Sequence, residues 1–225
     1  MSVHTGASFG FIGTRRGMFV QPSAGKSAVC FVLLAMLAVP TPVLARHHAR
    51  HQVLAESCSQ PRPPQTTVSL TGVQATVDFS PDGGGQALIL QVLAAARHSI
   101  LVQAYSFSDR RILAALGAAK ARGVDVRVIL DKTDAESYQH HKPVAAMIAA
   151  QGIQVWIDDS VRIAHNKVMI IDGTDLITGS YNFTYSAAHA NAENLLYLRN
   201  AAALVQAYIA DWNWRQSCSR AYTGH

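Results

Sequence analysis

The sequence is poor in charged residues, and its net charge says little about binding partners. Only 15% of the 225 residues are charged and 49% are hydrophobic, which argues against a wholly disordered chain and allows one sizeable core. The formal net charge is +5, but three basic residues, Arg15, Arg16 and Lys26, precede position 46. Taking these three from the 19 basic residues leaves 16 against 14 acidic residues, a net charge of +2. Global charge therefore gives only weak support for a polyanionic partner.

The N-terminal region lacks an apolar run long enough to span a membrane. Its apolar stretch covers residues 28–39 and ends at Pro40, whereas a helix needs about 20 residues to cross a bilayer. A basic flank at Lys26 and a small-residue site at Val43-Leu44-Ala45 complete the pattern of a secretory signal peptide. The sequence therefore favours export with cleavage over membrane anchoring.

Cleavage near Ala45 would remove residues 1–45 as a signal peptide and leave a periplasmic or secreted protein. Translation from Met18 would give a leader of ordinary length, and the choice between Met1 and Met18 stays open. The polar segment 46–66, which contains several histidines and prolines, is predicted to be a flexible arm.

Cysteine is scarce, and Cys30 lies within the predicted leader. Cys58 and Cys218 remain, an even number in a protein expected to be exported. They flank the whole domain, so a bond between them would close a long loop and contribute about 4–5 kcal/mol in the chain-entropy model. We favour an intramolecular disulfide, with two unpaired thiols or an intermolecular bridge as the alternatives.

The sequence also lacks the usual cofactor motifs. The glycines at 83–85 are not followed by Lys-Ser/Thr and fit no G-x-G-x-x-G register, so a plain turn is expected there. His47, His48 and His51 form a cluster that a metal could bind, but a solvated tail is the favoured interpretation. No His, Cys or carboxylate has a spacing that completes a metal site with the polar residues after position 160. We therefore predict no cofactor and a metal-independent reaction.

Apolar periodicity predicts alternating strands and helices. The expected strands are 73–79, 100–105, 124–130, 154–157, 167–171, 176–178 and 194–198, and the expected helices are 86–97, 110–122, 136–150 and 201–215. This order predicts an α/β fold in which a mixed β-sheet is flanked by helices on both faces. The Asp172-Gly173 pair between two of the strands predicts a tight antiparallel turn.

The chemically informative segment runs from His165 to Asp172 and has the pattern H-x-K-x4-D. His165 and Lys167 are two residues apart, so they share one face of an extended strand. Asp172 is seven residues from His165, an odd spacing that turns it away on a continuous strand. Because imidazole titrates near neutrality, it can attack phosphorus or protonate a leaving group. The His-Lys pair therefore predicts chemistry on a phosphodiester.

Polar residues after the following strands extend this site. Ser180 and Asn182 place a hydroxyl and an amide two residues apart, where with Lys167 they would neutralise phosphate oxygens. Glu193 could hold one imidazole nitrogen and fix its tautomer. The candidate catalytic residues are His165, Lys167, Asp172 and Glu193, and the candidate phosphate-binding residues are Lys167, Ser180 and Asn182.

This combination of residues resembles the HKD signature of the phospholipase D superfamily. The likeness extends to Ala104-Tyr105-Ser106-Phe107, Ala121–Val126 and Asn191–Asn194, which are similar to short, exported bacterial endonucleases of the Nuc type. The likeness covers about residues 73–215. We therefore expect a single-HKD phospholipase D-like domain with slightly wider bounds, residues 67–220. The paired cysteines and the longer arm depart from the family pattern.

The resemblance implies a role for each candidate. It makes His165 the nucleophile that forms a phosphohistidine intermediate, while Lys167, Ser180 and Asn182 bind phosphate. It assigns Glu193 to orienting the histidine and Asp172 to organising the local structure rather than to proton transfer.

The motif occurs only once, although the reaction needs both a nucleophile and a general acid. Larger members of the superfamily carry two HKD copies in one chain, and here His140, His141 and His189 lie in no comparable motif. We therefore expect a homodimer in which two copies of His165 face one phosphate across the two-fold axis.

The motif leaves the substrate open. Nucleic acid, DNA or RNA, is the favoured substrate because the sequence after the leader shows no obvious apolar membrane-docking stretch. A phospholipase D acting on phosphatidylcholine-type lipids is the alternative, and a non-catalytic phosphate-binding adaptor is a third interpretation.

Overall fold

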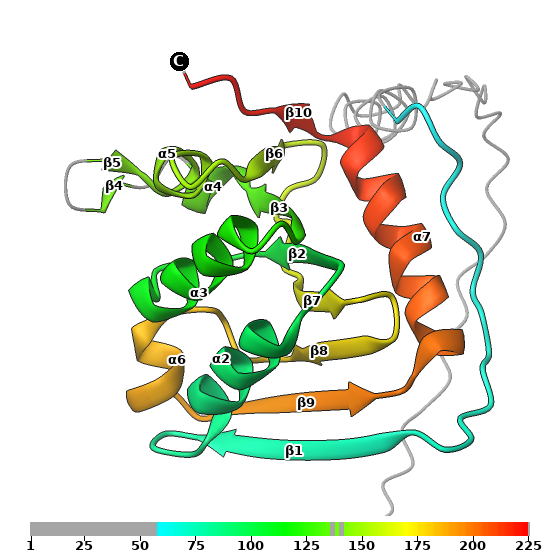
Figure 1. The fold of residues 1–225 in the computed structure, drawn as a ribbon. Helices are drawn as coiled ribbons and strands as arrows, with labels where there is room; N and C mark the ends of the chain where they lie inside the picture. The colour runs from blue at the N-terminus through cyan, green and yellow to red at the C-terminus, as the bar shows by residue number, and fades with distance from the viewer. Residues whose placement is uncertain (1–57, 136–137, 140–141, 225) are drawn as a thin grey trace, which may run out of the picture. The chain divides into compact units, whose positions relative to one another are not determined.

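The computed structural model describes residues 58–135, 138–139 and 142–224 (Figure 1). The predicted signal peptide at 1–45, both candidate start codons and the first part of the arm, 46–57, lie outside the described residues. The same holds for His140 and His141.

An eight-stranded mixed sheet forms the centre of the fold, with strand order β1-β9-β8-β7-β2-β3-β6-β10. Its strands are β1 (Gln74–Ser80), β2 (Ser99–Ala104), β3 (Asp125–Asp131), β6 (Gln154–Asp158), β7 (Lys167–Ile171), β8 (Asp175–Gly179), β9 (Glu193–Arg199) and β10 (Arg220–Ala221). Strand β3 pairs in parallel with β2 and β6, and the other ladders of this sheet are antiparallel. The predicted mixed sheet is confirmed.

Helices cover both faces of the sheet, as predicted (Figure 1). The helices are α2 (Gly85–Ala95), α3 (Arg110–Ala121), α4 (Lys132–Ala135), α5 (Val144–Ala149), α6 (Tyr185–His189) and α7 (Ala202–Cys218). Met169 and Ile171 of β7 pack in the core cluster that includes α2 and α3, whereas Val168 and Ile170 pack in the cluster that includes α7. Because side chains alternate along a strand, β7 is buried on both faces and fixed in the middle of the fold.

The turn predicted at Asp172-Gly173 joins β7 to β8 as an antiparallel hairpin. Both residues have positive φ angles, 53° and 70°. Asp and Gly are among the residues that tolerate this left-handed conformation.

The single helix predicted at 136–150 is wrong. Residues 138–139 and 142–143 instead form a small antiparallel hairpin, β4 (Tyr138–Gln139) with β5 (Lys142–Pro143), and α5 begins only after it. The reason is Pro143, which would remove a backbone donor inside a helix but is tolerated at the N-cap of α5, where it lies. Helices α4 and α6 and strand β10 were not predicted, and α7 extends three residues beyond the expected end at Arg215.

A disulfide joins Cys58 to Cys218, as the favoured alternative predicted. It fixes the described end of the arm beside the C-terminal turn of α7, where the Ser59 amide donates a hydrogen bond to the Ser217 carbonyl (3.5 Å). Within the described residues, no helix has both the length and the apolar character of a membrane span.

Candidate active site

Most of the predicted site residues lie along one side of the sheet formed by strand ends, where β2 and β8 end and β7 and β9 begin. The antiparallel register pairs Ala104 with Lys167, and the Tyr105 amide donates to the carbonyl of Asn166 (2.8 Å). On the neighbouring ladder, the Ser180 amide donates to the carbonyl of Asn194 (3.1 Å). These pairings place the loop that carries His165 and the loop that follows β8 at the same edge of the sheet.

The loop that leads to His165 is held by a buried carboxylate. Asp131, fully buried at the end of β3, accepts hydrogen bonds from the amides of Ala164 (2.7 Å) and Thr133 (2.8 Å). The side chain of His165 is exposed, and its ring lies 4.3 Å from that of Tyr105, centroid to centroid. Among the described residues, neither ring nitrogen has a hydrogen-bond partner. The backbone of His165 is therefore fixed while its imidazole remains open to a substrate.

Lys167 places a buried ammonium behind the histidine. The residue is 6% exposed, and its Nζ donates to the carbonyl oxygen of His165 (2.8 Å) and lies 4.8 Å from the centroid of the Tyr105 ring. Burial lowers the pKa of Lys167 because it desolvates the charged form, while the negative charge of Glu193 partly offsets this effect. An ammonium has three donors, so Lys167 keeps capacity to bind a phosphate oxygen.

The carboxylate of Glu193 contacts the serine of the site rather than the histidine. Ser180 donates its hydroxyl to Glu193 (2.6 Å) and accepts from the amide of Asn194 (3.0 Å). The other carboxylate oxygen accepts from the side-chain amide of Asn191 (3.1 Å). The predicted bond from Glu193 to His165 is not among these contacts, so the orienting role of Glu193 stays a prediction.

The loop after β8 requires the glycine that precedes Ser180. Gly179 has a φ of 147°, and a Cβ atom at this position would collide with the carbonyl oxygen of Asn194. The close approach lets the backbone and hydroxyl of Ser180 bond to Asn194. Gly179 thereby allows the serine to pack against the start of β9.

Two polar groups of this loop are buried without a hydrogen-bond partner among the described residues: the hydroxyl of Tyr181 and the amide oxygen of Asn182. Burial, together with the negative charges of Asp109, Asp78 and Glu193, raises the pKa of Tyr181 to about 12. The phenol is therefore neutral at physiological pH. The structure places Asn182 in the same loop as Ser180, as expected, and leaves its amide oxygen as a spare acceptor.

Asp172 lies at the opposite end of β7 and is not brought to His165. Its carboxylate accepts from the backbone amides of Arg97 (2.9 Å), His98 (2.7 Å) and Ser99 (3.0 Å). Burial alone would raise the pKa of Asp172, but these three hydrogen bonds and the charge of the neighbouring His98 together outweigh it and lower the pKa. The geometry fits the structural role that the resemblance implies, because Asp172 ties the β7–β8 hairpin to the segment between α2 and β2.

Tyr105, which was not predicted to be a site residue, has a ring that contacts both His165 and Lys167. A usable signal was present, because Tyr105 directly follows a buried strand that pairs with the strand carrying Lys167. His189, by contrast, pairs with Asp82 (3.4 Å) and with the ring of Tyr185, contacts that involve none of the site residues.

The fold and the site together define a class of protein. An exposed imidazole, a buried ammonium, and hydroxyl, amide and carboxylate groups meet at the edge of a mixed α/β sheet, an arrangement suited to a phosphodiesterase. Among the described residues, no group of three or more His, Cys, Asp or Glu side chains is placed to hold a metal ion. The independence from metal stays a prediction.

A family model described as "Cardiolipin synthase, PLD-like domain" matches residues 89–215, more than half of the chain. The chain belongs to the phospholipase D superfamily and is a phosphodiesterase, a class of hydrolase.

Named relatives include lipid-directed enzymes. A phospholipase D of Rickettsia prowazekii is 41% identical over 143 residues, which cover 64% of this chain and 68% of the relative. A mitochondrial cardiolipin hydrolase of Mus musculus is 35% identical over 112 residues, 50% of this chain and 49% of the relative. Both names describe hydrolysis of phospholipids by the relatives.

Among solved structures, the phospholipase D family member Nuc from Salmonella typhimurium is similar, with a TM-score of 0.62 and 36% identity. The match covers 67% of this chain and 98% of that one. NucT from Helicobacter pylori, with a TM-score of 0.57 and 21% identity, supports the fold alone.

Proposed function

We propose that the protein is an exported, metal-independent endonuclease that hydrolyses DNA or RNA through a phosphohistidine at His165. The observation that carries this proposal is the exposed imidazole of His165 with the ammonium of Lys167 buried behind it. A polymer backbone can lie across an exposed group at a sheet edge. Recognition centred on phosphate carries no base information, which explains the expected lack of sequence preference.

The proposed reaction has two displacements. Neutral His165 attacks phosphorus, a P–N bond forms, the P–O bond to the leaving group breaks, and an imidazolium supplies the proton that the leaving oxygen takes up. That second imidazole then removes a proton from water as the water attacks phosphorus and breaks the P–N bond. Lys167 offsets the charge that develops on the phosphate oxygens, and Ser180 can join it once its hydroxyl turns away from Glu193.

One chain supplies only one such imidazole, so the proposal includes a homodimer with a shared site. The test mixes parent protein with an equal amount of His165→Ala protein under conditions that allow subunit exchange. If one site needs both copies, random pairing leaves roughly a quarter of the dimers fully active. Activity per parent chain should then fall by half, whereas independent sites would leave it unchanged.

The chemistry is tested by incubating the purified protein with plasmid DNA in EDTA beside the His165→Ala variant. We expect cleavage that EDTA does not reduce and that the variant lacks. Cleavage by the variant would contradict the histidine mechanism, and loss of activity in EDTA would contradict the metal-free one.

A phospholipase D that hydrolyses phosphatidylcholine-type lipids is the second candidate, favoured by the names of the relatives. The same residues suit both substrates, because each offers a phosphodiester. Parallel assays on plasmid DNA and on phosphatidylcholine vesicles separate the two. Release of head groups without any cleavage of DNA would favour the lipid enzyme.

Export is part of the proposal. It is supported by the predicted cleavage site near Ala45 and by the disulfide between Cys58 and Cys218, a bond typical of oxidising compartments.

A further inference from the structure

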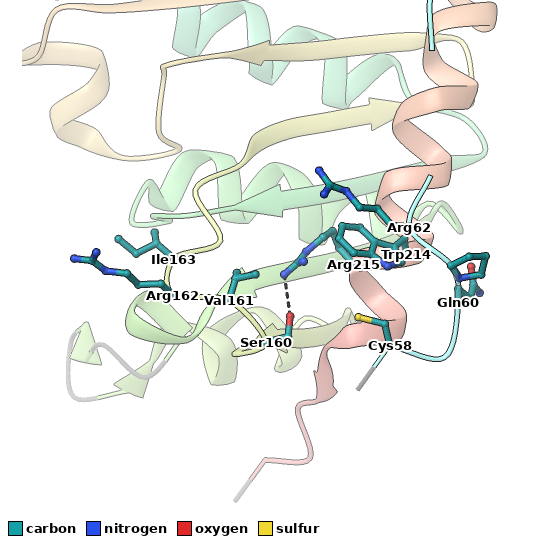
Figure 2. A pocket seen from close by; sticks show the side chains of 10 residues that line it. Cys58, Gln60, Arg62, Ser160, Val161, Arg162, Ile163, Trp214 and Arg215 are labelled. Atoms are coloured by element: carbon teal, nitrogen blue, oxygen red, sulfur yellow. Dashed lines mark hydrogen bonds between the residues drawn. The ribbon is translucent and has the colours of Figure 1, made fainter. Parts of the chain in front are cut away.

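An open pocket of about 890 Å³ lies between three segments of the chain (Figure 2). The described arm forms one wall with Arg62, the loop before His165 forms another with Arg162 and Ile163, and the end of α7 contributes Trp214 and Arg215. Figure 2 shows Arg162 and Ile163 on one side of the pocket and Arg62 with Trp214 on the other. None of the roles derived above uses this pocket.

The arm wall is attached by specific contacts. The disulfide joins Cys58 to α7, and the guanidinium of Arg62 lies 5.7 Å from the centroid of the Trp214 ring. Arg215 lies 5.0 Å from the same centroid. The pocket therefore combines an indole with two guanidinium groups on a wall that the disulfide holds in place.

The pocket is positively charged. Its lining contains three arginines and neither aspartate nor glutamate. Arg215 is neutralised by a buried ion pair with Asp158 and also donates to the hydroxyl of Ser160 (3.0 Å). In the part of the chain that the structure describes, no carboxylate pairs with Arg62 or Arg162. Two guanidinium charges thus remain for an anionic ligand.

The pocket is close to the active site because one of its lining residues is near His165 in the sequence. Ile163 lies two residues before His165, so their Cα atoms are at most about 7 Å apart. Ile163 and His165 are exposed, while Ala164 between them is buried, with its amide held by Asp131. The lining residue and the imidazole are therefore neighbours on the accessible surface of one fixed loop.

We propose that this pocket binds a nucleotide of the nucleic-acid strand adjacent to the phosphate at His165; this inference rests on the proposed function. Arg62 and Arg162 contact its phosphate, because a guanidinium matches phosphate geometry with paired hydrogen bonds. The base stacks on the indole of Trp214 or on the guanidinium of Arg62. An acyl chain would instead require continuous apolar walls, and here the arginines interrupt them.

The test measures binding in a His165→Ala background, so that cleavage does not interfere. Affinity for a fluorescent single-stranded oligonucleotide is followed by polarisation for added Arg62→Ala, Arg162→Ala and Trp214→Leu changes. We expect each to weaken binding about five- to tenfold, and each arginine change to reduce the salt slope by about one. Arg62→Lys keeps the charge but not the paired geometry, so its loss should be smaller.

Arg199→Ala is the matched control, since it removes one exposed arginine at the end of β9 opposite Glu193. It should change oligonucleotide affinity less than about twofold. Thermal melting checks that every variant is folded, and both Arg62 and Arg162 are exposed, which makes misfolding a poor explanation for lost binding.

The outcomes separate this inference from the function on which it rests. Unchanged oligonucleotide affinity in the Arg62→Ala and Arg162→Ala proteins overturns the pocket, even if the parent cleaves DNA and His165→Ala does not. If these two variants sediment less with phosphatidylcholine vesicles than the parent does, and their oligonucleotide affinity is unchanged, the pocket would be assigned to lipid. If the parent hydrolyses only lipid, the proposed function fails, and the binding assay still decides the pocket.

Discussion

The two ends of strand β7 carry parts of one sequence motif that differ in their hydrogen bonding. The groups at one end are open to a ligand, whereas the group at the other end is bonded to the backbone. At the N-terminal end, His165 is exposed and the buried ammonium of Lys167 retains donors for a ligand. At the C-terminal end, the carboxylate of Asp172 accepts hydrogen bonds from three consecutive backbone amides. A group already saturated by the backbone has little capacity for a substrate. The comparison supports a proposed division of the motif into one end for chemistry and one end for structure.

The sharpest test of this division is His165→Ala. Removing the imidazole should lower phosphodiesterase activity about 10³-fold or more, because the proposed symmetric dimer would lose both its nucleophile and its general acid. The melting temperature should stay close to that of the parent, since the side chain is exposed. Initial rates on plasmid DNA and thermal melting measure the two quantities.

His189→Ala is the control for this prediction. His189 is also exposed, but its contacts are with Asp82 and Tyr185 rather than with the site. Activity that falls equally in both variants would argue against a special role for His165.

Lys167→Met should have the next largest effect on activity. The substitution keeps much of the buried volume but removes the charge that offsets the developing phosphate oxygens, so kcat/KM should fall about 10²–10³-fold. Stability should hold or rise, because the desolvation cost of the ammonium disappears. Lys120→Met, in the last turn of α3, should leave kcat/KM unchanged.

The same lysine predicts an alkaline limit to activity. Because burial lowers the pKa of Lys167, the residue loses its proton below the ordinary lysine value of 10.5. Activity should therefore decline with rising pH before an ordinary lysine titrates. A pH profile of kcat/KM that is flat up to pH 10.5 would show that the charge of Lys167 is not needed.

Asp172→Asn should affect stability instead of chemistry. Loss of the charge weakens the hydrogen bonds from Arg97, His98 and Ser99 by about 1–3 kcal/mol in total. For a chain of this size the melting temperature should fall by about 2–4 °C per kcal/mol. Asparagine tolerates the positive φ angle at this position, so backbone strain does not confuse the result.

Activity per folded molecule should change little in this variant. Asp125→Asn is the control, because Asp125 makes an exposed ion pair with Arg127 that contributes little to stability. A large loss of activity in Asp172→Asn at full stability would overturn the division of the motif.

Much of this architecture was predictable from the sequence, because the patterns concerned are local. Apolar periodicity located the strands on either side of the Asp172-Gly173 turn, and the odd spacing between His165 and Asp172 predicted that their side chains diverge. The helix predicted at 136–150 was wrong because its pattern was read across Pro143, which lies at the start of α5.

The remaining features depend on contacts between distant segments. The tilted contact between the rings of Tyr105 and His165 needs the register of β2 against β7, which no periodicity specifies. The bond from Ser180 to Glu193 needs the close approach of β8 and β9 at Gly179. Spacing identified these side chains as polar and adjacent to strands, but not which of them are partners.

The smallest predicted effect is a pH dependence confined to the structural end of β7. The pKa of Asp172 is lower in the folded protein than its ordinary value of 3.8, so its stabilising contribution is complete above that value. The contribution is lost as the pH falls from 3.8 through the lowered pKa, because in this range the unfolded chain binds the proton more readily than the folded protein does. The difference in melting temperature between the parent and Asp172→Asn should therefore be constant near neutrality and shrink below pH 3.8. A difference that persists unchanged at the lowest pH where the parent still folds would mean that Asp172 acts through its shape rather than its charge.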